Sequence, residues 1–188
     1  MQSGGQGAVM ERMKELYQKQ ATTELMNNYH YKNMNQLPKI TKVVINAGVG
    51  RAIANSKFME EAIDAVKKIT GQAPVITKAK KSIAGFKVRE GMNVGVSVTL
   101  RGEKMYEFLD RLVNIALPRV RDFRGIKSNA FDGHGNYSLG MKEHGFFPEI
   151  SFEEAGTPIS LQINVATTAK TDDEAKTLLT SLGFPFRS

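Results

Sequence analysis

The sequence predicts an α+β fold, a mainly antiparallel sheet with helices packed on one face and a long basic loop projecting between two strands. Three segments alternate apolar and polar residues with a period of two, which is typical of half-buried strands. Segments with apolar residues at helical spacing separate them. The outward positions of the strands are polar, whereas the strands of a doubly wound parallel sheet would be apolar on both faces.

The N-terminal part predicts an extension, a helix and a first strand. Residues 1–8 are rich in Gly and Gln without periodicity, so we interpret them as a flexible extension before a single domain over 9–188. Apolar residues at helical spacing predict a helix over about 9–27, and alternation in residues 39–50 predicts a strand. The outward positions of that strand are Lys42, Val44, Asn46 and Gly48.

The central part predicts a helix and two strands joined by the basic loop. Asn55 or Ser56 can cap a helix that ends at Gly71, because glycine tolerates the left-handed backbone that follows a helix. A strand from Val75 follows, then a loop over about 79–92 and a second strand. That second strand has Val94, Val96, Val98 and Leu100 on its core side and Gly95, Ser97, Thr99 and Arg101 on the other.

The remaining residues predict two more helices and further strands. A helix follows the second central strand and should stop at Pro118, because proline lacks the amide that a helix needs. Two short strands should flank the turn at 132–136, and the alternation over 159–166 predicts the last strand. The last helix begins with a capping box, in which Thr171 and Glu174 can satisfy each other's free amides.

Composition excludes several classes of protein. The 188 residues include no Cys, so the chain has neither a disulfide framework nor a thiolate zinc site. No apolar run approaches the roughly 18 residues that span a bilayer, and the N-terminus lacks the apolar core of a signal peptide. We therefore expect a cytoplasmic protein with no membrane partner.

The formal net charge of +7 lies entirely in the central part of the chain. Residues 75–127 hold twelve Lys and Arg against five acids, and the other residues hold equal numbers of each sign. This concentration is typical of a surface that binds a polyanion. A solvated basic face without a ligand is the alternative.

The uncovered face of the predicted sheet carries short hydrogen-bonding groups. They are Lys42, Asn46, Gly48, Gly95, Ser97, Thr99, Arg101, Gln162 and Asn164. Hydroxyls and amides can meet ribose 2′-OH groups and phosphate oxygens, and the two cations can neutralise charge. Because its central strands present no aromatics, the face should bind folded RNA by shape and not by stacking on bases. The alternative is an ordinary solvated face, on which we would expect more Glu and Lys pairs.

The basic loop interleaves cations with the apolar residues Ile83, Phe86 and Val88. Its five cations, within twelve residues, are Lys78, Lys80, Lys81, Lys87 and Arg89. Cations can bind phosphates, and Phe86 can stack or anchor on RNA. Alternatively, the three apolar side chains pack the base of the loop.

The chain lacks the motifs of an enzyme or a nucleotide-binding protein. Residues 48–50 read Gly-Val-Gly after a strand, but the third glycine of a dinucleotide loop would fall at Ile53. The three His residues lack metal-binding spacing, and no acid-base or nucleophile constellation emerges. We predict no catalysis and no cofactor.

Long contiguous motifs give the chain its resemblance to a known family. The longest, over 77–125, reads TKAKKSIAGFKVREGMNVGVSVTLRGEKMYEFLDRLVNIALPRVRDFRG. Others lie at 39–50, 71–82, 129–137, 147–150 and 167–175. In these motifs the sequence resembles the bacterial large-subunit ribosomal protein five family. It departs from the family pattern at His144 and Gly145 and over 151–158, which lacks the basic residues of many members.

The resemblance implies a ribosomal protein of the central protuberance that binds 5S rRNA and helps to attach it. It implies that Asn46, Gln72, Thr99 and Arg101 face 5S rRNA and that the basic loop reaches the elbow of the peptidyl-site tRNA. The other implied partners are 23S rRNA, neighbouring large-subunit proteins and a small-subunit head protein at a bridge.

The predicted site residues combine the sheet face, the loop and the resemblance. The rRNA-binding set is Lys42, Asn46, Gln72, Lys78, Ser97, Thr99, Arg101, Gln162 and Asn164. The tRNA-binding set is Lys80, Lys81, Ser82, Gly85, Phe86, Lys87 and Arg89. The alternative functions are a free RNA chaperone or RNA-modifying factor, and a basic protein-interaction module.

Overall fold

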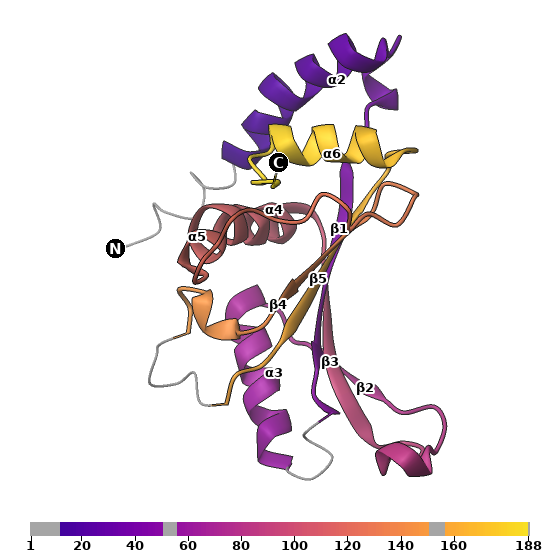
Figure 1. Cartoon of the computed structure of the whole chain (residues 1–188), viewed down its shortest axis with the longest axis vertical. Coiled ribbons are helices and arrows are strands. Elements are labelled where there is room, and N and C mark those ends of the chain that lie inside the picture. Colours follow the sequence, from indigo (N-terminus) through magenta and orange to yellow (C-terminus); the bar gives the residue numbers. More distant parts are fainter. Residues whose placement is uncertain (1–11, 51–55, 151–156, 188) are drawn as a thin grey trace. The chain divides into compact units, whose positions relative to one another are not determined.

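A computed structural model describes residues 12–50, 56–150 and 157–187 of the chain (Figure 1). It confirms an α+β fold with a five-stranded antiparallel sheet and several helices. The strands, in the spatial order β2-β3-β1-β5-β4, are β1 (Ile40–Gly48), β2 (Val75–Lys78), β3 (Asn93–Leu100), β4 (Tyr137–Met141) and β5 (Leu161–Thr167). The α-helices are α2 (Thr22–Tyr29), α3 (Ser56–Thr70), α4 (Gly102–Arg111), α5 (Leu117–Arg119) and α6 (Asp172–Ser181). The π-helical turns are η1 (Tyr17–Ala21) and η5 (Leu112–Ala116), and the 3-10 turns are η2 (Met34–Gln36), η4 (Ala84–Phe86) and η6 (His144–Phe146).

The chain divides into two compact units, each built from segments that are far apart in the sequence. The first comprises Met1–Val43, Arg101–Leu139 and Asn164–Ser188, and the second comprises Val44–Leu100 and Gly140–Ile163. A single domain over 9–188 stays a prediction.

In the second unit, α3 packs against β3 (Figure 1), and this packing buries the apolar side of the strand. Val96, Val98 and Leu100 are 0%, 2% and 0% exposed, and the apolar stripe of α3 is buried as well. The helix ends as the sequence predicts, because Gly71 adopts a φ of +64° and donates its amide to Lys67 O at 2.8 Å. The predicted cap at Asn55 or Ser56 lies outside the residues whose side chains the structure describes.

In the first unit, α2 packs against α6. Leu25 of α2 and Leu178 and Leu179 of α6 are fully buried. Two polar contacts accompany this packing: the hydroxyls of Tyr29 and Thr177 lie 3.2 Å apart, and Ser181 donates to the carboxylate of Glu24. These contacts hold the N-terminal and C-terminal helices together, although many residues separate them in the sequence.

The helix after β3 passes through Pro118, so the prediction that proline stops it is wrong. The helix continues from α4 into η5, a wider turn in which Leu117 N bonds to Leu112 O. It ends with α5. Pro118 lies just after η5, and the wider turn there accommodates a residue without an amide donor just before the helix ends at Arg119.

The C-terminal turns and caps differ from prediction in detail. Around 132–136 the structure has one strand, β4, and a single bridge from Phe131 to Tyr137, where two short strands are predicted. In the capping box, Glu174 N donates to Thr171 Oγ1 at 3.4 Å, as predicted. The Glu174 carboxylate, however, accepts from Lys170 N at 2.9 Å, because its side chain reaches one residue further back.

A buried histidine lies in the second unit. His144 is 3% exposed, and its Nδ1 accepts the amide proton of Ile159 at 3.2 Å, which requires the neutral imidazole. Burial lowers the pKa of His144 below its ordinary value of 6.5, and the nearby Glu143 opposes this shift. Glu61, Asp64 and Lys68 of α3 line the same surface pocket as His144.

We expect His144 to make the stability of the fold fall as the pH falls below about 6.5. The unfolded chain takes up the proton near that ordinary pKa, whereas the folded chain resists it, so protonation favours unfolding. In His144→Gln, the amide oxygen can still accept from Ile159 N but does not titrate. Urea unfolding between pH 7.5 and 5.5 should therefore show a weaker pH dependence for His144→Gln than for the unsubstituted protein.

The control is His134→Gln, which makes the same substitution at an exposed position of the first unit. Equal slopes for the unsubstituted protein and His144→Gln would contradict the assignment.

Candidate nucleic-acid interface

The second unit leaves the polar side of β3 uncovered. Ser97 is half-buried and Thr99 is exposed, although Val96, Val98 and Leu100 between and beside them are buried. Successive side chains of a strand point to opposite faces, so the helix α3 covers one face only. On β1, Val44 and Asn46 are half-buried and alternate with buried residues in the same way.

A glycine flattens the middle of this face. A Cβ at Gly95 would lie 2.7 Å from Thr77 Oγ1, which is closer than real Cβ contacts, and 3.2 Å from Ala47 O, which is tighter than most such contacts. Asn46 Oδ1 would be 3.9 Å away. The absence of a side chain at Gly95 therefore lets Thr77 of β2 and Asn46 of β1 approach each other across β3.

The end of α3 positions Gln72 at one corner of the face. Thr70 Oγ1 donates to Val66 O at 2.7 Å and lies 3.3 Å from the amide of Gln72. Gln72 Nε2 then donates to Thr99 O at 3.3 Å. Two predicted rRNA-binding residues that lie far apart in the sequence are thus joined by a hydrogen bond.

Sequence reasoning missed two residues of this face, Val75 and Thr77. Val75 pairs with Ser97 and Thr77 with Gly95, so both side chains lie on the polar side of β3. Val75 is 68% exposed. The four-residue strand β2 is too short for its own alternation to reveal this, and only its pairing with β3 assigns the faces.

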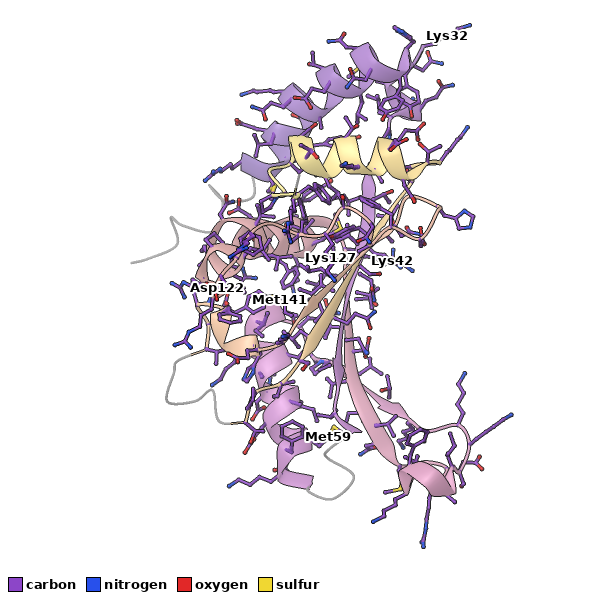
Figure 2. All side chains as sticks on the ribbon, in the orientation of Figure 1. Lys32, Lys42, Met59, Asp122, Lys127 and Met141 are labelled. Atoms are coloured by element: carbon purple, nitrogen blue, oxygen red, sulfur yellow. The ribbon has the colours of Figure 1, made fainter. Side chains whose placement is uncertain are left out.

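The other predicted rRNA-binding residues have different surroundings. Lys78 and Gln162 in the second unit are exposed. In the first unit, Arg101 is exposed at the start of α4, and Lys42, labelled in Figure 2, is half-buried on β1. Asn164 Oδ1 is buried and has no hydrogen-bond partner in the described part of the chain, so that oxygen is not available to a ligand at the surface.

Residues 79–92 form a second, smaller hairpin beyond β2 and β3. Ala79 donates its amide to Met92 O at 2.8 Å and accepts from Gly91 N at 2.9 Å. Further out, Ile83 and Val88 exchange both backbone hydrogen bonds, and η4 closes the tip between them. The predicted basic loop is therefore a hydrogen-bonded hairpin in this structure.

The hairpin presents its cations and an aromatic ring to solvent. The exposed cations of the hairpin are Lys80, Lys81, Lys87 and Arg89, and Lys78 lies just before them at the end of β2. Among the described residues none of these five cations forms an ion pair. Phe86 is 73% exposed and Ile83 is 48% exposed, so these side chains do not pack the base of the hairpin. Ser82 has an internal role, because its Oγ accepts from Glu90 N at 2.9 Å.

Residues 132–136 form a turn, as the sequence predicts, and carboxylate side chains bind its backbone amides. The pKa of Asp132 is lowered to about 2 by the bond from Asn136 Nδ2 at 2.7 Å and by the bonds from the amides of His134 and Asn136 at 2.9 and 3.0 Å. Asp172 accepts from the amides of Gly133 and Gly135. Both carboxylates thus stabilise the backbone of the loop.

The described ranges offer no sign of two other kinds of site. No three His, Cys, Asp or Glu side chains gather there to bind a metal ion. None of the helices in those ranges has the length and apolar character needed to cross a membrane.

Comparison with known proteins gives matches along most of the chain. Residues 33–89 match the family described as Ribosomal protein L5, and residues 93–186 match the family that describes the C-terminus of the same ribosomal protein. The protein "Large ribosomal subunit protein uL5" of Geotalea uraniireducens (strain Rf4) is 55% identical over 179 residues, which cover 95% of this chain and 100% of that protein.

The fold, the interface and these matches define a ribosomal protein, a structural component and not an enzyme. The chain belongs to the ribosomal protein L5 family. As a member it is a constituent of the large subunit of the ribosome in the cytoplasm, and the resemblance seen in its sequence is confirmed.

We expect Gly95→Ala to lower the free energy of unfolding by about 1–3 kcal/mol, the usual cost of overpacking. The added Cβ would clash with Thr77 Oγ1 and press on the backbone oxygen of Ala47. Adding Thr77→Ala should recover part of the loss, whereas adding Thr77→Ser should not, because serine keeps the oxygen. Urea unfolding measures all three variants.

The matched control is Gly48→Ala, because a Cβ at Gly48 meets nothing within 4 Å. If Gly95→Ala were as stable as the unsubstituted protein, the close approach across β3 would be disproved.

Proposed function

We propose that the chain binds 5S rRNA through the uncovered polar face of the second unit and thereby helps to attach 5S rRNA to the large subunit. The observation that carries the proposal is the pattern of β3, in which Ser97 and Thr99 are accessible while the alternating valines and leucine are buried under α3. A sheet that is buried on both sides could not present the hydroxyl groups of Ser97 and Thr99 to a ligand.

The chemistry of the face suits the backbone of a folded RNA. The minor groove of an RNA helix is wide and shallow and displays 2′-hydroxyls, which both donate and accept hydrogen bonds. The short side chains of Asn46, Thr77, Ser97 and Thr99 allow an RNA backbone to come close, and Gly95 leaves the centre flat. The predicted contact of Gln162, which is exposed in the same unit, belongs to this proposal. The contacts of Lys42, Arg101 and Asn164, in the first unit, stay predictions, and Asn164 could act only through its amide nitrogen because its Oδ1 is buried.

The cationic hairpin supports a second contact, to the peptidyl-site tRNA. It places Lys80, Lys81, Lys87 and Arg89 in solvent without carboxylate partners in the described part of the chain, beside the exposed ring of Phe86. Cations of this kind attract phosphates, and an exposed ring can stack on a base. Ser82 and Gly85 would support the tip, Ser82 through its bond to Glu90 N.

We propose the remaining partners from the family resemblance alone, without assigning residues to them. They are 23S rRNA, neighbouring large-subunit proteins and a head protein of the small subunit at an inter-subunit bridge. A free RNA chaperone would share the face but would not sediment with the large subunit in a lysate, so sedimentation separates the two functions.

We expect Thr99→Val combined with Arg101→Ala to weaken binding of 5S rRNA by about a hundredfold or more. A neutral hydrogen bond contributes about 1 kcal/mol and one to a charged group about 1.5–3 kcal/mol, and about 1.4 kcal/mol is tenfold in affinity. Gel shift with a 5S rRNA transcript measures the affinity, and circular dichroism should show a folded protein, because both side chains are exposed.

The control is Thr180→Val with Arg187→Ala, which removes the same groups from exposed positions elsewhere. Unchanged affinity in the Thr99 and Arg101 variant, or an equal loss in the control, would refute the assignment to the sheet face.

We expect Lys80→Glu with Lys81→Glu to spare the 5S rRNA complex and to impair tRNA binding to the peptidyl site. The two cations lie in the hairpin, beyond the paired residues of β2 and β3. Peptidyl-site occupancy of ribosomes reconstituted with the variant should fall several-fold, while gel shift with 5S rRNA changes by less than about threefold.

Charge reversal at Lys170 and Lys176, which are exposed in the first unit, is the control and should leave occupancy unchanged. If the Lys80 and Lys81 variant lost both activities together, the hairpin and the sheet face would not act separately.

A further inference from the structure

Val75 is a large apolar side chain that the fold leaves in solvent. It is 68% exposed, compared with 38% for the next residue, Ile76. The two side chains point to opposite faces of β2, since Val75 pairs with Ser97 and Ile76 with the buried Val96. The described core of the second unit therefore gives no reason for an apolar residue at this position.

The neighbours of Val75 are the residues of the candidate interface. Thr77 lies two residues along the same face of β2, against Gly95, and Ser97 is directly opposite on β3. Thr99 follows on β3, with Gln72 bound to its carbonyl oxygen. β2 is the edge strand of the sheet, so this corner extends the polar face to its border (Figure 1).

The charge around the corner selects the kind of partner. Residues 72–89 carry five cations and no acid. A polyanion is favoured beside such a segment, whereas a protein surface would need matching acidic groups. A single exposed valine is also too small an apolar area to anchor a protein partner.

We propose that Val75 contacts the docked RNA and packs its methyl groups against the ribose carbons of the backbone. The proposal rests on the proposed binding of 5S rRNA by this face. Riboses present C–H groups between the 2′-hydroxyls and the phosphates. The hydroxyls of Thr77 and Thr99 would therefore meet polar groups of the RNA backbone, and the methyl groups of Val75 between them would meet ribose C–H groups. Val44 on β1, half-buried beside Asn46, is a second short apolar group of the same face.

An apolar contact and a phosphate contact differ in their response to salt. Each phosphate that a cation neutralises contributes roughly 0.7–0.9 to the slope of log affinity against log salt concentration. Removing methyl groups removes no charge, so it lowers affinity at every salt concentration by the same factor. This difference tests the chemical nature of the contact and not only its location.

The experiment measures binding of a 5S rRNA transcript to the full chain over a range of salt concentrations. We expect Val75→Ala to weaken binding about three- to tenfold with an unchanged salt slope, because two buried methyl groups are lost. Lys78→Gln, which removes the cation at the end of β2, should lower the slope by about 0.7. Ile76→Ala, the matched truncation on the opposite face, should leave affinity within about twofold once thermal unfolding shows that the variant is folded.

Each outcome bears on the inference. If Thr99→Val with Arg101→Ala loses binding and Val75→Ala does not, the proposed function stands and the inference is wrong. A loss in Val75→Ala that comes with a lower salt slope also overturns it, because the contact would then be electrostatic. If the unsubstituted protein does not bind 5S rRNA, both the proposed function and the inference fail.

Discussion

The candidate interface depends on the register of β3, because a strand has only two faces. Val96, Val98 and Leu100 are nearly inaccessible under α3, and this burial fixes which residues point the other way. A shift of one residue would place Ser97 and Thr99 in the core and the valines in solvent. Burying a valine or leucine side chain contributes about 1.5–3 kcal/mol. The hydrophobic core of the second unit therefore also determines which groups a ligand meets.

The faces of the long strands could be predicted from the sequence, because alternation of apolar and polar residues over seven or eight positions strongly indicates a half-buried strand. The strands β1, β3 and β5, the glycine that ends α3 and the Thr171 cap all follow from local patterns, and the structure confirms them. The predictions about Pro118 and the reach of Glu174 are wrong because other local arrangements compete. A helix can widen ahead of a proline. The long carboxylate side chain of Glu174 can accept a hydrogen bond from either of two neighbouring amides.

The parts of the interface that could not be predicted depend on pairing between distant segments. Val75 and Thr77 take their faces from β3, about twenty residues later in the chain. The bond from Gln72 to the backbone of Thr99 likewise needs the end of α3 beside β3. The stabilising bond from Glu90 N to Ser82 exists only because the loop over 79–92 folds back on itself as a hairpin. A periodicity within one segment carries none of this information.

The arrangement separates two physical requirements of RNA binding. Close approach to a backbone needs short, mostly uncharged groups, because long cationic side chains would hold the RNA away and lose conformational freedom on binding. Attraction over a distance needs charge, and it does not require close fit. In the proposed function, the sheet face of the second unit would supply the first with Asn46, Ser97 and Thr99, and the hairpin would supply the second with exposed cations. Salt therefore weakens the attraction by the hairpin more than it weakens the uncharged contacts of the face, to which charged residues such as Lys78 and Arg101 add a smaller salt dependence.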